Sequence, residues 1–260
     1  MSWDALALEL SAELGCAITL DALTGGWRIA QRASGHRHSV DDVVTARYAL
    51  DEIAAAPPTS VLDLGSGIGG VGLLVLWGLG SAARLVCVEA QAISHRLLVA
   101  NIAGNGLAGR VEPRLGDLRD LALDDRFALI TGSPPYFPLG TGVLPADSQK
   151  AHARFELRGD IGDYALAAVR HLTADGVFVC CFPTPQRARA IHRIEAAGLH
   201  VTAWRDVVPR AGLRPLFSLF ACRLTAATCR VDPPLVVRSH DGAVTEEMLA
   251  IRRRFGFEDR

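Results

Sequence analysis

The stretch that decides the fold reads Val61-Leu62-Asp63-Leu64-Gly65-Ser66-Gly67-Ile68-Gly69-Gly70. An apolar run ends in a cluster of glycines, and a second apolar run follows over residues 71–79. This order predicts a buried strand, a tight turn and a helix. Glycines in such a turn let the backbone approach a ligand closely and leave amide donors at a helix N-terminus. We therefore expect a ligand site where this strand ends.

Strand and helix patterns alternate after this stretch. Besides residues 60–64, the expected strands are 84–89, 110–114, 127–131 and 176–182, and the expected helices are 71–79, 92–105, 164–172 and 185–197. Such alternation indicates a mainly parallel sheet covered on both faces. The last two strands, 200–208 and 216–224, are joined by too few residues for a helix and predict an antiparallel hairpin. The pattern predicts an α/β, Rossmann-like fold with a seven-stranded sheet.

Both ends of the chain carry additions to this core. We expect the core at residues 57–225, preceded by a helical segment over 1–56 that packs on it. Residues 226–260 form a tail that ends in a helix-like stretch, 246–255. One structural domain overall is expected.

Composition excludes several classes of protein. The 260 residues are 50% hydrophobic with a net charge of -1, which excludes a disordered chain and a strongly cationic nucleic-acid binder. The longest apolar run, 68–80, is too short and too rich in glycine to cross a bilayer. The six cysteines lack zinc-binding spacing. We expect a cytoplasmic protein with no metal and no membrane partner.

Two cofactors are compatible with the glycine motif. Gly65, Gly67 and Gly70 satisfy the dinucleotide fingerprint, and Glu89 ends the next strand, where an acid binds ribose hydroxyls. Asp63 favours S-adenosylmethionine, because its carboxylate suits a cationic amino-acid moiety and would repel a pyrophosphate. Asp117 follows the third strand and is a candidate acceptor for an adenine amino group. S-adenosylmethionine is the preferred cofactor, and NAD is the alternative.

A second motif follows the fourth strand. It reads Ser133-Pro134-Pro135-Tyr136-Phe137, and it lies at the edge of the sheet where ligands bind in folds of this kind. The prolines fix the turn and leave carbonyl acceptors, Ser133 adds a hydroxyl, and Tyr136 adds an aromatic face. This set suits a planar amine whose nitrogen attacks an activated methyl group, with catalysis by positioning and electrostatics.

The two motifs together carry a family resemblance. Asp63-Leu-Gly-Ser-Gly with Ser133-Pro-Pro-Tyr136 resembles the amino-methyltransferases with an (Asn/Asp/Ser)-Pro-Pro-(Tyr/Phe/Trp) motif. Three further segments resemble the bacterial tRNA1(Val) adenine-N6 methyltransferase group within it: Gln31 through Gly35-His36-Arg37-His38-Ser39-Val40-Asp41, then Ala153-Arg154-Phe155-Glu156, then Pro233-Pro234-Leu235 with residues 242–247. The resemblance runs in the same order over about residues 19–255.

The resemblance implies a class I S-adenosylmethionine-dependent methyltransferase that modifies N6 of adenine 37 in a valine tRNA. Its implied cofactor-binding residues are Arg37, Asp41, Asp63, Gly65, Ser66, Gly67, Gly69, Glu89, Asp117 and Ser133. Its implied catalytic residues are Ser133, Pro134, Pro135 and Tyr136, and its implied substrate-binding residues are Tyr136, Phe137 and Arg154. The implied partner is tRNA.

The chain departs from the group at the reaction motif. Serine stands at position 133 where the group usually has asparagine, and Ser-Pro-Pro-Tyr also resembles the motif of cytosine-N4 DNA methyltransferases. The alternative hypotheses are a protein glutamine or small-molecule amine as acceptor, and a non-catalytic homologue that binds cofactor and RNA. Arg205, Arg210 and Arg214 flank the predicted hairpin and are candidates for a basic rim.

Overall fold

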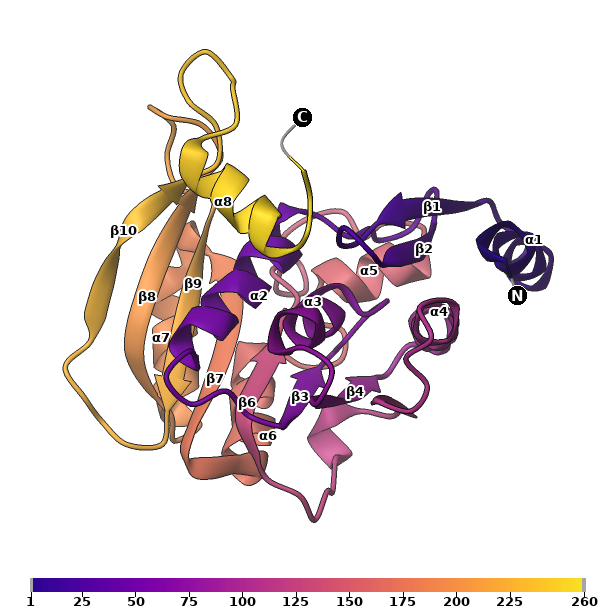
Figure 1. Ribbon diagram of the computed structural model, residues 1–260. Coiled ribbons are helices and arrows are strands. Elements are labelled where there is room, and N and C mark those ends of the chain that lie inside the picture. Colours follow the sequence, from indigo (N-terminus) through magenta and orange to yellow (C-terminus); the bar gives the residue numbers. More distant parts are fainter. Residues whose placement is uncertain (1, 259–260) are drawn as a thin grey trace.

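The computed structural model describes residues 2–258 and contains an eight-stranded sheet in the order β10-β8-β9-β7-β6-β3-β4-β5 (Figure 1). Its strands are β3 (Ser60–Leu64), β4 (Arg84–Glu89), β5 (Val111–Leu115), β6 (Phe127–Gly132), β7 (Leu172–Pro183), β8 (His200–Val208), β9 (Phe217–Arg223) and β10 (Arg230–Val236). Only β9 runs antiparallel to its neighbours. The predicted Rossmann-like architecture is confirmed, and an eighth strand extends it.

Helices cover both faces of this sheet. The helices are α1 (Trp3–Leu14), α2 (Val40–Glu52), α3 (Gly70–Leu79), α4 (Ala92–Gly104), α5 (Ser148–Arg154), α6 (Ile161–His171), α7 (Arg187–Ala196) and α8 (Glu246–Arg254), with short 3-10 turns at Leu118–Asp120 and Thr184–Gln186. One apolar core joins α2, α3 and α4 to the sheet, and a second joins α6 and α7 to the other face. Alternate residues of a strand supply the two cores, because successive side chains point to opposite faces.

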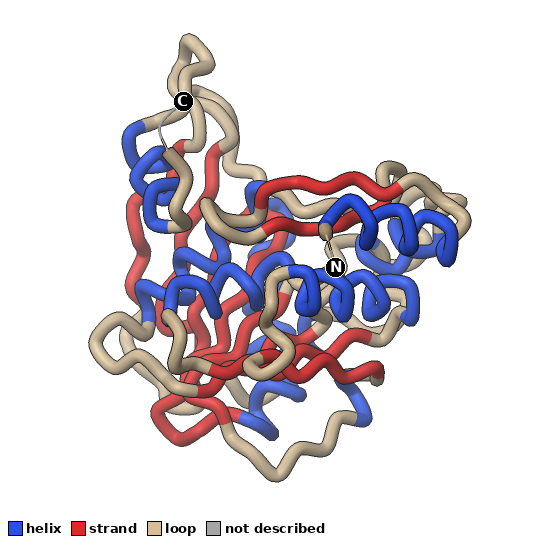
Figure 2. The backbone as a smooth tube through the Cα atoms, turned by 45° about the vertical axis from the view of Figure 1, so that its right-hand side comes forward, coloured by secondary structure: helices blue, strands red, loops and turns tan. Residues whose placement is uncertain are grey.

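An N-terminal hairpin lies beside the sheet rather than in it. Strands β1 (Ile18–Ala22) and β2 (Arg28–Arg32) pair antiparallel, and Figures 1 and 2 show them grouped with α1 and α4 at one side of the molecule. Fully buried Asn101 attaches the hairpin: its amide group bonds the Ala30 backbone at both N and O, and donates to the Ile68 carbonyl at 2.9 Å. The hairpin is thereby bonded to the glycine turn after β3.

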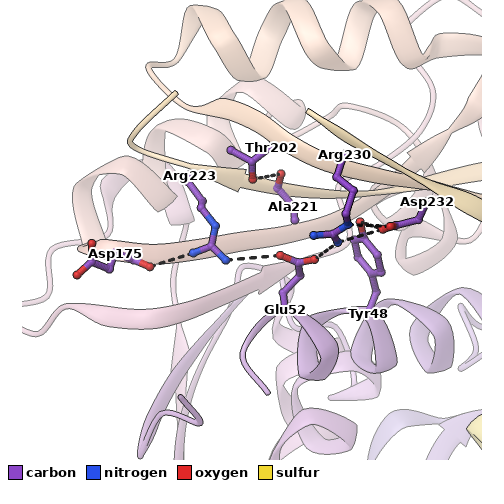
Figure 3. Close-up of polar contacts among 8 residues, drawn as sticks. All are labelled: Tyr48, Glu52, Asp175, Thr202, Ala221, Arg223, Arg230 and Asp232. Atoms are coloured by element: carbon purple, nitrogen blue, oxygen red, sulfur yellow. Dashed lines mark hydrogen bonds and ion pairs between the residues drawn. The ribbon is translucent and has the colours of Figure 1, made fainter. Parts of the chain in front are cut away.

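A polar network attaches the extra strand β10 (Figure 3). Glu52, at the end of α2, forms ion pairs with Arg223 of β9 and Arg230 of β10. The Tyr48 hydroxyl donates to Asp232 at 3.0 Å, and Asp232 also pairs with Arg230. Helix α2 is therefore tied along its second half to the last strand of the sheet.

Three elements differ from the sequence prediction. Strand β10 was expected as part of a tail because it contains Pro233 and Pro234, and prolines lack the amide that a ladder needs. The structure accommodates them at the sheet edge, where the register shifts between Asp232 and Leu235. Strand β1 has five residues and helix α5 has seven, most of them polar in α5, so both are too short for a strong sequence signal. No helix in the described part of the chain has the length and apolarity needed to span a membrane.

Candidate active site

The turn after β3 adopts a conformation that suits glycine. Gly65 and Gly67 have φ values of 62° and 57°, in the left-handed region that other L residues rarely adopt. The Gly67 amide donates to the Glu89 carboxylate at 2.8 Å, which joins the turn to the end of β4. A side chain at Gly65 would collide with the Tyr164 hydroxyl. Position 65 therefore requires glycine, because of its left-handed backbone conformation and because Tyr164 leaves no room for a side chain.

A Gly65→Ala substitution should destabilise the protein and weaken cofactor binding together. The left-handed backbone costs about 1–2 kcal/mol for alanine, and relief of the Tyr164 contact costs more. We expect the melting temperature to fall by several degrees in calorimetry. Gly109→Ala is the matched control, because Gly109 has no positive φ and open space around it. Equal melting temperatures for the two variants would contradict the role assigned to Gly65.

Asp63 is a buried carboxylate with one unused oxygen. It is 1% exposed, and its Oδ1 accepts from the Thr131 hydroxyl at 2.7 Å. Its Oδ2 has no hydrogen-bond partner among residues 2–258. Burial raises the pKa of Asp63 to about 6, against the opposing effect of the Thr131 hydrogen bond. A buried carboxylate with a free acceptor suits a cationic ligand group, which would restore the stabilisation lost on leaving water.

Glu89 has the hydrogen bonds expected of a ribose-binding acid. One carboxylate oxygen accepts from the Gly67 amide and the other from the Gln91 amide at 2.7 Å. Burial raises the pKa of Glu89 against these donors. Each carboxylate oxygen has a second lone pair, so both can accept a further hydroxyl. The two backbone bonds hold the side chain in place for that purpose.

Asp117 is already paired with an arginine. Its two oxygens accept from the Arg119 side chain at 2.9 and 2.7 Å, and these bonds lower the pKa of Asp117. It also accepts from the Arg119 amide and so begins the 3-10 turn at Leu118. Asp117 is therefore ionised, and the Arg119 side chain already donates one hydrogen bond to each of its carboxylate oxygens.

One cavity brings most of the predicted cofactor residues together. The predicted residues that line it are Arg37, Asp63, Gly65, Ser66, Gly67, Glu89, Asp117, Ser133 and Pro135. Asp41, Gly69, Pro134, Tyr136, Phe137 and Arg154 are not among the lining residues. Since strands β3, β4, β5 and β6 are parallel, their carboxyl ends meet at this edge.

Gly69 contributes to the helix instead of the cavity. It is the N-cap of α3, with φ 97°, and Leu73 and Leu98 lie where a side chain at this position would be. Ser66 lines the cavity while its hydroxyl donates to the Asp63 carbonyl at 2.8 Å. Both residues therefore shape the turn through packing and backbone bonds.

The Ser-Pro-Pro-Tyr turn begins directly after β6. Ser133 lies in the cavity lining, and its Oγ is 3.7 Å from the Cys181 sulfur. The half-buried Tyr136 ring lies edge-on to Phe182 at 5.8 Å, and its hydroxyl contacts Asp41 at 3.3 Å and Cys181 at 3.2 Å. Burial, with the nearby Cys181 and Asp41, raises the pKa of Tyr136 and keeps its hydroxyl neutral.

Arg154 holds the turn through its backbone. Its carbonyl accepts from the amides of Tyr136 and Phe137 at 3.0 and 2.8 Å, while its side chain is exposed. Phe137 is 42% exposed, and its ring packs on Phe155 at 5.5 Å. Both side chains lie at the surface beside the turn, where an incoming acceptor would meet them.

Arg37 and Asp41 lie on opposite sides of the start of α2. Arg37 lines the cavity and forms an ion pair with Asp21 at 3.0 Å. Burial and the neighbouring Asp42 carboxylate raise the pKa of Asp41, which accepts from the Tyr136 hydroxyl. The segment that holds both residues therefore connects the hairpin to the reaction turn.

Several cavity residues were not predicted from the sequence. Gln149 of α5 is 1% exposed, accepts from the Arg32 side chain and the His36 amide, and donates to Ser94. Its neighbour Asp147 forms an ion pair with Arg32 at 2.8 Å. These contacts hold α5 against the hairpin as one wall of the cavity. No sequence motif marks Gln149, because its partners come from three distant segments.

Asp42, His38 and Tyr164 were also missed. Burial raises the pKa of Asp42, but hydrogen bonds from the His38 ring at 3.0 Å and the Ser39 amide at 2.9 Å outweigh it and the pKa is lowered. Asp42 therefore stays ionised in the cavity wall, next to Gly70 of α3. The sequence signal that predicts the start of α2, and with it the position of Asp42, is the capping box formed by Ser39 and Asp42.

The lining fits S-adenosylmethionine better than a dinucleotide. The free oxygen of Asp63 suits an ammonium group, and a pyrophosphate at the same turn would face that carboxylate and Asp42. Glu89 offers acceptors for ribose hydroxyls, and Asp117 and Leu118 also line the cavity. The cavity continues to Ser133, so a methyl donor held there faces the reaction turn.

Comparison with known proteins agrees with this assignment. The chain is 25% identical to a tRNA1(Val) (adenine(37)-N6)-methyltransferase from Phocaeicola vulgatus, over 82% of this chain and 84% of that protein. It is 27% identical to the enzyme of the same name from Klebsiella pneumoniae, over 75% and 79% of the two chains. The resemblance predicted from the motifs is confirmed by these relatives. No family model matches the chain.

Solved structures share the fold. A predicted O-methyltransferase from Agrobacterium tumefaciens superposes with a TM-score of 0.62 at 18% identity, covering 85% of this chain and 99% of that one. The class I methyltransferase fold predicted from the sequence is thereby confirmed.

Proposed function

We propose, from the premise that this chain is a relative of the tRNA1(Val) (adenine(37)-N6)-methyltransferases, that it methylates N6 of an adenine in tRNA with S-adenosylmethionine. Adenine 37 of a valine tRNA is the proposed position. The observation that carries the proposal is one continuous cavity between Asp63, with its free carboxylate oxygen, and Ser133 of the reaction turn. A tRNA substrate would place the enzyme in the cytoplasm.

The residues that line the cavity have two separate tasks in this proposal. Asp63 would hold the ammonium group of the cofactor, and Glu89 would accept from its ribose hydroxyls. The cofactor supplies an electrophilic methyl group on a sulfonium. Asp42 adds a second negative charge to the wall, which favours a cationic cofactor over its neutral-sulfur product.

The reaction turn would hold the amine. The Ser133 hydroxyl and the carbonyls of the Ser-Pro-Pro-Tyr turn accept from its N–H bonds, because the prolines have no amides to donate. These hydrogen bonds would hold the amine with its nitrogen lone pair toward the methyl group. The C–S bond would break as the N–C bond forms, and the nitrogen would then release one proton to water. Tyr136 and Arg154 keep the turn in place through the contacts at Asp41, Cys181 and the Arg154 carbonyl. Positioning of the two reactants then supplies most of the rate enhancement.

The substrate can be tested with labelled methyl groups. Unmodified valine tRNA transcript should incorporate label as N6-methyladenosine in nucleoside mass spectrometry, and a transcript with guanosine at position 37 should not. Asp63→Asn protein is the control for cofactor-dependent transfer. Label found as N4-methylcytidine, or found in protein or metabolite fractions instead of tRNA, would contradict the proposal. Tight cofactor binding without transfer to any fraction would favour the non-catalytic alternative.

A further inference from the structure

Two loops are bonded to each other at one end of the sheet. Residues 209–216 join β8 to β9, and residues 237–245 join β10 to α8. The Ala211 amide donates to the Arg238 carbonyl at 2.8 Å, and the Arg238 guanidinium donates to the Gly242 carbonyl at 2.8 Å. Figure 1 shows both loops projecting together beyond the strands, in orange and yellow. They form one surface, which we call the loop rim.

The loop rim lies on the same side of the sheet as the reaction turn, the side where the parallel strands have their carboxyl ends. Strand β8 and β10 are parallel to each other and, through antiparallel β9, to β7 and β6. Their carboxyl ends therefore point the same way as the end of β6, where Ser133 begins the turn. Three strand steps separate β6 from β8, which is about 14 Å at 4.8 Å per step. An extended substrate can reach both places at once.

The loop rim carries unneutralised positive charge. Arg210, Arg214 and Arg238 are exposed, and Asp241 is the one acidic residue in the two loops, so the formal charge of the loops is +2. None of these three arginines forms an ion pair within residues 2–258. Arg205, a candidate for the same rim, differs because it is paired with Glu247.

Exposed apolar side chains lie on the same loop as two of these arginines. Leu213 and Leu216 are 58% and 59% exposed on the same loop as Arg210 and Arg214. A surface with guanidinium groups around exposed aliphatic side chains suits a nucleic-acid strand, whose phosphates take the charges and whose sugars and bases cover the apolar area. An acidic protein surface would satisfy the charges but has less flat apolar area to cover the leucines.

We propose that the loop rim binds the backbone phosphates of the RNA whose target base enters the cavity at Ser133, with Arg210 and Arg214 as the principal contacts. The inference rests on the proposed RNA substrate and adds where the rest of that substrate lies. Arginine suits this role because its planar guanidinium binds phosphate oxygens in pairs. Since phosphates are common to all sequences, the rim supplies affinity, while the cavity and its turn select the base.

Steady-state kinetics of an Arg210→Ala/Arg214→Ala double variant test this inference. Arg238 is left unchanged, because its side chain bonds the Gly242 carbonyl and so stabilises the shape of its own loop. We expect the KM for tRNA to rise about tenfold, with kcat and the cofactor Kd within about twofold of wild type. The plot of log Kd for tRNA against log salt should become shallower by about one to two units, one for each lost phosphate contact. An Arg210→Lys/Arg214→Lys variant keeps the charges and should retain most of the salt dependence.

Arg84→Ala is the matched control for loss of surface charge. Arg84 is exposed at the start of β4, on the side of the sheet opposite to the strands' carboxyl ends. Its loss should leave the KM for tRNA and the salt slope unchanged. If wild-type protein methylates tRNA and the double variant has the same KM and salt slope as wild type, this inference is overturned while the proposed function stands. The inference would also be overturned if Arg84→Ala raised the KM for tRNA as much as the double variant does, or if the double variant were impaired only with a protein acceptor. Absence of any transfer to tRNA by wild-type protein would instead contradict the proposed function, and this inference with it.

Discussion

Asp63→Asn protein should bind S-adenosylmethionine at least about a hundredfold more weakly than wild type. Removing one partner of a buried charge pair typically costs about 3–5 kcal/mol, and each 1.4 kcal/mol is a factor of ten in affinity. Asparagine keeps the shape and the bond from Thr131, but it replaces the free Oδ2 of Asp63 with an amide that repels an ammonium group. Isothermal titration calorimetry measures the change.

The pH dependence of cofactor binding gives an independent check. Asp63 has a pKa of about 6 in the unliganded protein, so it becomes neutral as the pH falls through that value. Cofactor affinity should therefore decrease more steeply below pH 6 in wild type than in Asp63→Asn, in which Glu89 still titrates. The folded-state pKa exceeds the ordinary value of 3.8, so the stability of unliganded protein should fall as pH rises from about 4 to 6. The decrease should be smaller in the Asp63→Asn variant, where Glu89 and Asp41 still contribute because their pKa values are raised as well.

Asp117→Asn is the matched control for these measurements. Asp117 lines the same cavity, but it is partly exposed and its charge is already balanced by Arg119. Its loss should weaken binding by less than about tenfold, because exposed ion pairs contribute about 0–1 kcal/mol. Equal affinities of wild type and Asp63→Asn would remove the basis for placing a cationic ligand group at Asp63.

Tyr136→Ala should lower kcat by about a hundredfold or more while changing cofactor affinity by less than about twofold. Tyr136 does not line the cavity, but its ring packs on Phe182 and its hydroxyl reaches Asp41 and Cys181. Loss of these contacts frees the turn that holds Ser133, and a displacement of about 1 Å at a reacting group can cost a hundredfold in rate. Single-turnover methyl transfer with saturating cofactor measures the step.

The Tyr136→Phe variant separates the ring from the hydroxyl. It keeps the edge-on contact with Phe182 and loses the bonds to Asp41 and Cys181, so we expect an intermediate rate. Ser133→Ala should also reduce kcat without affecting cofactor binding, because its hydroxyl is one of the proposed acceptors. A Tyr136→Ala protein with wild-type kcat would exclude a role for the turn in catalysis.

Much of the sheet could be predicted because its strands have strong local signals. The bounds of β3, β4 and β8 agree with the predicted ranges 60–64, 84–89 and 200–208. Strands β3 and β4 contain apolar runs, β8 has Val and Thr at four of its nine positions, and each is followed by a turn or a change in pattern. Strand β10 lacks such a signal, since its two prolines oppose a strand and it is stabilised by pairing with β8 and by the ion pair of Arg230 with Glu52.

The cavity could be predicted only in part for a similar reason. Asp63, Gly65 and Glu89 are linked by short-range sequence order and by the rule that parallel strands end at one edge. Gln149 and Cys181 depend instead on where distant segments meet. Cys181 contacts Tyr136 because it lies on the face of β7 that turns toward α2, while Cys180 faces the other core. That orientation depends on a register that no local pattern reveals.

The ion pairs of Glu52 have a consequence for the order of assembly during synthesis. Helix α2 begins at the cavity, with Asp42 in its first turn, and ends at Glu52, whose partner Arg230 belongs to the last strand. Chains emerge from the ribosome N-terminus first. The helix that carries Asp42 therefore gains its final anchorage only after nearly nine-tenths of the chain has been translated, so a nascent chain lacks a fully secured binding wall until its last strand has emerged.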